Sequence, residues 1–245
     1  MPDVIDSSMD ALQTASNYKF SATRIENLGA PEYTLATSVC DASGSVMDFK
    51  DDLEKCLKTV AESCQKSPRA ENLMYRVAAF NNGVYEVHGF KLLSDINPGD
   101  YDDCINPSGM TALFDATHTA IEATKDYGKI LVDQDFAVNA VIFIITDGFE
   151  NASSVGINSI KDVIRQTQHD ECLESLTTVL IGVGNEPNLV DELKAFKDDG
   201  GLNQFIAIGE ATPAKLAKLA SFISRSISST SQALGSGQAS ALLTF

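Results

Sequence analysis

The chain has 245 residues, of which 44% are hydrophobic, and a formal net charge of −16. This length and apolar fraction are sufficient for the core of one large domain. The acidic balance argues against binding to nucleic acid or to anionic lipid, because both need clustered Lys and Arg. No apolar run reaches the length of a membrane span. The sequence therefore predicts a partner that is neither a nucleic acid nor a membrane.

The cysteines and the first residues of the chain bear on location. There are five cysteines, an odd number, and Cys40 falls in a predicted core strand. Residues 1–10 are polar and acidic, unlike a secretory signal. We therefore expect a reduced, cytoplasmic protein, in which the sequon Asn151-Ala152-Ser153 carries no glycan.

The N-terminal third contains one confident strand and one confident helix. Residues 1–32 form a polar extension, in which the alternating patch Tyr18–Ile25 predicts an edge strand. Thr34–Cys40 is apolar on both faces and predicts a central strand. From Phe49 to Cys64 apolar residues recur every three or four positions, which predicts a helix.

A hairpin follows. Leu73–Phe80 and Val84–Phe90 have the pattern of strands and are joined by Asn81-Asn82-Gly83, a typical hairpin connection. One edge of the sheet is therefore predicted to be antiparallel. After a loop rich in Pro and Gly, a helix is predicted from Thr111 to Tyr127.

The rest of the chain alternates between strands and helices. The predicted elements are strand Val138–Thr146, helix Ile157–His169, strand Leu176–Val183, helix Leu189–Lys197, strand Gln204–Ile208 and helix Pro213–Ser228. This alternation predicts an α/β fold: a three-layer, open, mostly parallel sheet with one antiparallel edge strand and helices on both faces. The predicted domain spans residues 33–228, and a Ser/Gly-rich C-terminal segment, 229–245, follows it.

Three motifs rich in side-chain oxygen lie at or beside the ends of predicted strands. They contain Asp41, Ser43 and Ser45 in the first motif, Thr111 in the second and Asp147 in the third. Open α/β sheets bind ligands outside the carboxyl ends of their strands, so these loops can meet. Hydroxyl and carboxylate oxygens suit a small hard cation, Mg²⁺ or Mn²⁺.

Each motif also has an ordinary structural interpretation. Asp41 and the two serines are suitable helix N-caps after a strand, and Asp147-Gly148 is a common turn. These interpretations do not explain why the three motifs occur together in this order. With only two carboxylates in the set, a bound cation would keep much of its charge. A carboxylate from a partner would then be attracted to it.

Asp-x-Ser-x-Ser, the distant Thr111 after Gly109, and Thr-Asp-Gly after a buried strand resemble the metal-ion-dependent adhesion site (MIDAS) of von Willebrand factor A (vWA) domains. The resemblance covers roughly residues 33–228. It implies that Ser43 and Ser45 bind the metal directly and Thr111 directly or through water. It also implies that Asp41 and Asp147 act largely through water, and that the fold is vWA-like.

Other candidate motifs are weaker. His88, His118 and His169 fall in separate predicted elements, without cysteine or acidic clusters, and are not predicted to bind metal. Gly182-x-Gly184 is read as a turn, because the residues after it do not continue a dinucleotide loop. Glu150 and Asn151 either line the rim of the metal site or belong to a solvated loop.

The leading functional hypothesis is a non-enzymatic adaptor of bacterial or phage type that captures the Asp or Glu of a partner protein through Mg²⁺ or Mn²⁺. One alternative is a metal-dependent hydrolase, such as a phosphatase, that uses Asp41; Ser at position 43 and the lack of a positioned Lys speak against it. Another is a structural homo-oligomer assembled through the terminal arms, since the polar C-terminal segment ends in Leu242, Leu243 and Phe245.

Overall fold

The computed structural model describes residues 8–245, which form one eight-stranded sheet with helices on both faces. The strands are β1 (Met9–Gln13), β2 (Lys19–Thr23), β3 (Glu32–Asp41), β4 (Leu73–Phe80), β5 (Val84–Leu92), β6 (Ala137–Thr146), β7 (Leu176–Val183) and β8 (Gln204–Gly209). The α-helices in this range are α1 (Lys50–Gln65), α2 (Leu113–Val132), α3 (Ile157–His169), α4 (Leu189–Gly200) and α5 (Pro213–Gly235). The strand order is β1-β2-β5-β4-β3-β6-β7-β8.

The centre of the sheet is parallel, as the sequence predicts. β3 pairs in parallel with both β4 and β6, and β7 and β8 continue the parallel array. Nearly every residue of β3 and of β6 is buried. This is the burial expected for strands that are covered by helices on both faces. The predicted fold class is confirmed.

The antiparallel hairpin is also confirmed, but the sheet extends beyond it. β4 and β5 pair antiparallel across Asn81–Gly83. β2, which lies within the predicted edge patch, pairs in parallel with β5. It is not the outermost strand, because β1 pairs antiparallel with its other side. The sequence did not predict β1, whose five residues alternate only weakly between buried and exposed positions.

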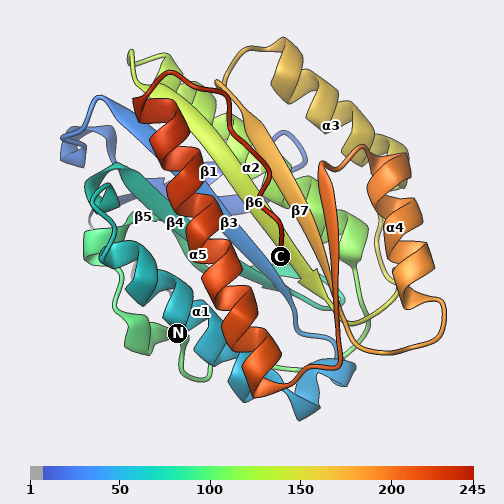
Figure 1. Ribbon diagram of the computed structural model, residues 1–245. Coiled ribbons are helices and arrows are strands. Elements are labelled where there is room, and N and C mark those ends of the chain that lie inside the picture. The colour runs from blue at the N-terminus through green and yellow to red at the C-terminus, as the bar shows by residue number, and fades with distance from the viewer. Residues whose placement is uncertain (1–7) are drawn as a thin grey trace.

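The helices form two outer layers around the sheet (Figure 1). α1 and α5 pack together on one face and enclose a core with side chains from β3, β4, β6 and β7. α2, α3 and α4 cover the opposite face. Apolar side chains of β3 and β6 contribute to both cores. The two central strands are therefore the best-fixed elements of the fold, and both end at the candidate site.

Helix α5 is longer than the sequence predicts. It continues past Ser228 to Gly235, because small polar residues in its last two turns are buried and bonded. Arg69 donates to the Ser231 hydroxyl at 2.9 Å, and Asn139 donates to the Thr230 carbonyl at 2.8 Å. Residues 236–245, hereafter the tail, have no regular structure. The predicted division into residues 1–32, 33–228 and 229–245 stays a prediction.

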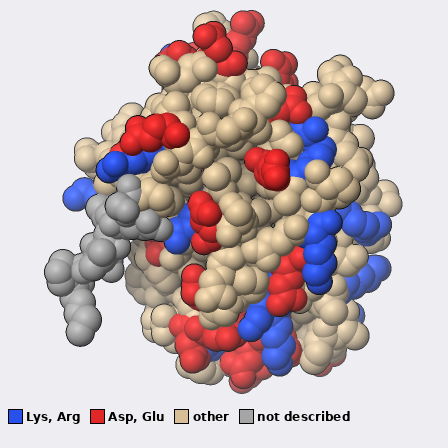
Figure 2. All heavy atoms as spheres, turned by 90° about the vertical axis from the view of Figure 1, so that its left-hand side faces the viewer, with Lys and Arg blue, Asp and Glu red and all other residues tan. Residues whose placement is uncertain are grey.

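The surface is charged but mixed. Figure 2 shows acidic and basic side chains close together on one face, with several acidic ones gathered near its lower end. Ion pairs such as Lys50–Asp103, at 2.8 Å, bring opposite charges together in a chain whose net charge is −16. Within residues 8–245, none of the helices combines the length and apolarity needed to cross a bilayer.

Candidate metal centre

Asp41 is the last residue of β3, and its carboxylate is almost fully buried. One oxygen, Oδ1, accepts a hydrogen bond from the Ser43 backbone N–H at 2.8 Å. The other, Oδ2, accepts from the Thr146 hydroxyl at 2.6 Å. Burial raises the pKa of this carboxyl, and the two hydrogen bonds act in the opposite direction. The side chain is thus held in one orientation from both sides.

A chain of short contacts joins the first motif to the third. The hydroxyl oxygens of Ser43 and Ser45 lie 3.0 Å apart. Ser45 Oγ then donates to Asp147 Oδ1 at 2.9 Å. Because β3 and β6 are adjacent parallel strands, the loops that follow them leave the sheet side by side. Three of the predicted ligands therefore lie within hydrogen-bond distance of a neighbour in the set.

Thr111 reaches the same place from the loop before α2. Its Oγ1 lies 3.2 Å from the position that a Cβ on Gly148 would occupy, so it is next to the Asp147 turn. The loop is tied to the first motif by the Gly44 N–H, which donates to the Gly109 carbonyl at 3.2 Å. The structure thus brings together the loops that carry all five predicted site residues.

The two carboxylates make the electrostatic environment of the site favourable for a cation. Burial, together with the charge of Asp41, raises the pKa of Asp147 to about 6, while the Ser45 hydrogen bond acts to lower it. Among residues 8–245, no Lys, Arg or His forms an ion pair with either carboxylate. Two carboxylates and three hydroxyls form a hard, oxygen-only donor set, and such a set fits Mg²⁺ or Mn²⁺.

Two residues hold the site in shape through contacts that the sequence did not predict. Thr146, one position before Asp147, orients Asp41 through the hydrogen bond to Oδ2. Asn151 holds Thr111 by its backbone: its Oδ1 accepts from the Thr111 N–H at 2.8 Å, and its own N–H donates to the Thr111 carbonyl at 3.1 Å. Thr146 belongs to the Thr-Asp-Gly motif and Asn151 follows it closely, and this position was the only available signal.

Glu150 has a structural role that neither sequence interpretation anticipated. Its Oε2 accepts from the Phe114 N–H at 2.8 Å, in the first turn of α2, and its Oε1 accepts from two backbone N–H groups of its own loop. A carboxylate at this position accepts from an N–H that has no partner within the helix, and it interacts favourably with the positive end of the α2 dipole. Glu150 and Asn151 therefore fix the β6–α3 loop against the start of α2.

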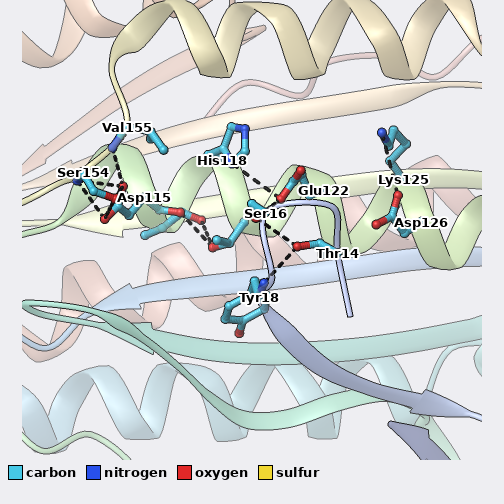
Figure 3. Close-up of polar contacts among 12 residues, drawn as sticks. Thr14, Ser16, Tyr18, Asp115, His118, Glu122, Lys125, Asp126, Ser154 and Val155 are labelled. Carbon is cyan, nitrogen blue, oxygen red and sulfur yellow. Dashed lines mark hydrogen bonds and ion pairs between the residues drawn. The ribbon is translucent and has the colours of Figure 1, made fainter. Parts of the chain in front are cut away.

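A second polar cluster lies where the turn between β1 and β2 meets α2 (Figure 3). The turn between β1 and β2 reaches α2 through Ser16, whose hydroxyl donates to Glu122 Oε2. His118 Nδ1 lies 3.6 Å from the same oxygen. In a nucleophilic triad the histidine would lie between the hydroxyl and the carboxylate. Here the carboxylate lies between the other two groups, so the cluster anchors the turn and does not activate Ser16.

No protein-family model matches the sequence, and no curated protein does. Solved structures do match. The D319A mutant of the PilB minor pilin from Streptococcus sanguinis has a TM-score of 0.59 and 14% identity over 86% of this chain. Proximal thread matrix protein 1 from the mussel byssus has a TM-score of 0.57 and 18% identity over 80% of it. The ArnB paralog VWA2 from Sulfolobus acidocaldarius has a TM-score of 0.53 and 13% identity over 89%.

The match leaves much of each solved chain uncovered. This chain spans 65% of the pilin, 46% of the mussel protein and 53% of VWA2. At these identities the likeness concerns the fold. One structure of the mussel protein, with a TM-score of 0.54 and 18% identity, has a zinc-occupied MIDAS motif. This chain has the α/β fold of a von Willebrand factor A domain.

Proposed function

We propose that this protein is a metal-dependent protein-binding module. Asp41, Ser43, Ser45, Thr111 and Asp147 would hold a divalent cation, Mg²⁺ or Mn²⁺, at the carboxyl ends of β3 and β6. The observation that carries the proposal is the series of contacts from Ser43 Oγ to Ser45 Oγ and on to Asp147 Oδ1, at 3.0 and 2.9 Å. These oxygens are already close enough to share one ion.

The composition of the donor set suggests what the module would bind. Three of the five side chains are neutral hydroxyls, so the set does not saturate the charge and coordination of a divalent ion. An Asp or Glu from a partner would complete both. The zinc-occupied MIDAS motif of the mussel protein supports a divalent cation at the corresponding place in this fold.

A binding role is favoured over catalysis. The similar structures include a minor pilin, a byssus matrix protein and a pilus adhesin, whose names describe assembly or adhesion. In the part of the chain that the structure describes, no Lys or Arg is paired with the site carboxylates to offset phosphate charge. Turnover of a generic phosphate ester that Asp41→Asn abolishes would favour a hydrolase instead. A cytoplasmic location stays a prediction.

Metal-dependent stabilisation tests the site directly. A ligand at about 100 times its Kd stabilises the folded state by about 2.7 kcal/mol, which corresponds to about 5–10 °C in Tm for a domain of this size. We expect Mg²⁺ or Mn²⁺ to raise Tm, and Asp41→Ala to abolish the rise.

The matched control is Asp133→Ala, which removes a solvent-exposed carboxylate paired with Lys129 at the far end of α2. This variant should respond to metal as the native chain does. A native chain whose Tm does not change with saturating metal would contradict the proposal. Capture of a peptide with a single Asp, dependent on metal and lost in Asp41→Ala, would test the partner chemistry.

A further inference from the structure

The tail folds back onto its own domain. After α5 the chain reverses at Gly237, which has a positive φ of 65°, and the Gln238 N–H donates to the Ala233 carbonyl at 2.8 Å. Figure 1 shows the tail, in dark red, running beside α5 over the face of the sheet. It covers a strip of surface between α5 and the starts of β7 and β8, on the face that α1 and α5 cover; this strip is hereafter called the groove.

Side chains make the contacts in this groove. Ser240 Oγ lies 2.9 Å from Ser175 Oγ, just before β7, and Gln204 Nε2 at the start of β8 donates to the Leu243 carbonyl at 2.9 Å. The Phe245 ring meets Phe222 of α5 edge to face, with centroids 5.8 Å apart. Leu243 and Phe245 both pack against the core on this side of the sheet. The groove therefore accepts an extended segment with an aliphatic and an aromatic side chain two positions apart.

The tail is held by side-chain contacts more than by its backbone. Beyond Gln238, residues 239–245 make no backbone–backbone hydrogen bond with any other described residue. Leu242 is 50% exposed, and a cavity of about 470 Å³ lies between the tail and the end of α5. Segments with so few backbone hydrogen bonds open at lower free-energy cost than helices and strands.

The groove also contains an unsatisfied group. Gln204 Oε1 is buried and has no hydrogen-bond partner among residues 8–245, although Nε2 of the same amide is bonded to the tail. A side-chain amide can bond an extended backbone twice, by donating to a carbonyl and accepting from an N–H. Leaving a buried acceptor unpaired is unfavourable. The tail, which enters through the tight turn at Gly237, supplies only the carbonyl.

We propose that this groove is a docking site for an extended aliphatic–x–aromatic segment, and that the tail of a second copy of this chain occupies it by exchange. An exchanged tail makes the same apolar contacts as the chain's own tail, so little is lost when two copies swap. The turn at Gly237 does not connect an exchanged tail to the α5 of the chain that it binds. Its backbone can therefore shift until one of its N–H groups donates to Gln204 Oε1. The exchange increases with protein concentration.

A disulfide placed across the docking site distinguishes the two arrangements. Ser175→Cys with Ser240→Cys replaces two hydroxyl oxygens that lie 2.9 Å apart, a separation that a disulfide spans with small adjustments. We expect oxidation of the full chain to give an intramolecular link at low concentration and a growing share of covalent dimer at high concentration. Ser240→Cys alone is the control for non-specific linkage and should give no more dimer than the native cysteines do.

A peptide-binding measurement complements the disulfide experiment and does not depend on cysteine chemistry. The receptor is the full chain with Leu243→Asp and Phe245→Asp, which weakens its own tail, and the probe is a fluorescent peptide of residues 236–245. We expect the peptide to bind, and its Phe245→Ala form to bind at least about tenfold more weakly, as burial of an aromatic side chain requires. A link that stays intramolecular at every concentration, or a receptor that does not bind the peptide, would overturn the proposal.

Discussion

Ser45 Oγ donates a hydrogen bond of 2.9 Å to Asp147 Oδ1, although the two residues are 102 positions apart in the chain. The contact exists because β3 and β6 are neighbours in the parallel sheet, and each is followed by an oxygen-rich loop at the same edge. The Ser45 hydroxyl bridges Ser43 Oγ and Asp147 Oδ1. A bound cation would attract the same oxygens, so we expect the hydrogen bonds of Ser45 to change more than those of the other site residues when metal binds.

Replacing Ser45 with Ala should separate metal binding from stability. Ser45 is exposed, so its loss should change the free energy of unfolding without metal by no more than about 0.5 kcal/mol. The rise in Tm with Mg²⁺ should become much smaller, because one of the hydroxyl donors is gone. Ser94→Ala is a matched control, since its hydroxyl donates only to the adjacent Asp95 in the part of the chain that the structure describes. If Mg²⁺ raised the Tm of Ser45→Ala as much as that of the native chain, Ser45 would not be a metal ligand.

Thr146→Val should weaken metal binding although Thr146 is not a predicted ligand. The substitution keeps the shape of the buried side chain and removes the hydroxyl that donates to Asp41 Oδ2 at 2.6 Å. Loss of a residue that orients a metal ligand typically costs about 10–100-fold in affinity. Isothermal titration with Mn²⁺ measures the effect. Thr167→Val, which removes a hydroxyl bonded to the Val163 carbonyl within α3, should leave the affinity unchanged.

The sequence predicted the centre of the fold better than its periphery. The sequences of β3 and β6 are long and apolar on both faces, and both strands are buried on both faces. β1 (Met9–Gln13) was not predicted. It is an edge strand of five residues that is exposed over most of its length, so its sequence has no clear apolar pattern. The end of α5 was placed too early because its buried serines look like loop residues until their partners are known.

The candidate site shows the same limit. The five oxygen-bearing residues follow a linear pattern, so the sequence could nominate them. Thr146, Glu150 and Asn151 act through contacts with distant segments, at Asp41, Phe114 and Thr111 respectively. No spacing rule in one sequence reveals such contacts, because each depends on how two loops are placed by the sheet.

His88 should make the protein less stable as the pH falls. Its ring is enclosed between the Gly89 carbonyl, 2.9 Å from Nδ1, and the Tyr101 hydroxyl, 2.8 Å from Nε2, and burial lowers its pKa to about 4. An unfolded histidine takes up a proton near pH 6.5, whereas the folded one stays neutral until about pH 4. Between these values the unfolded state binds more protons, so the free energy of unfolding falls with falling pH.

The contribution of His88 can be isolated by comparison with His88→Gln. Urea unfolding between pH 7 and about pH 4.5 should give a steeper loss of stability in the native chain, by at most about 1.4 kcal/mol per pH unit, the limit for one proton. The raised pKa of Asp147 acts in the opposite direction in both proteins and therefore cancels in the difference. Equal slopes would show that His88 is protonated at its ordinary pH in the folded state.

Gly109→Ala should damage both the fold and the site through one loop. Gly109 has a φ of +73°, and a Cβ there would lie 1.8 Å from Asn82 Oδ1, the atom that accepts from the Met110 N–H. The side chain at 82 would have to leave and give up that bond, while the backbone strain would remain. Together these effects should cost about 1–3 kcal/mol of stability.

Asn82→Ala in the same background tells the two causes apart. It removes the clash but keeps the strained φ, so it should restore only part of the lost stability. Gly83→Ala is the matched control in the neighbouring hairpin, because no described residue beyond its chain neighbours comes within 4 Å of the added Cβ and its φ is not positive. Because the Gly109 carbonyl also accepts from the Gly44 N–H, the loop that carries Thr111 should move away from Ser43 and Ser45. Gly109→Ala should therefore lose Mn²⁺ affinity in isothermal titration, whereas Gly83→Ala should keep it; equal affinities would mean that this loop does not position Thr111 for the metal.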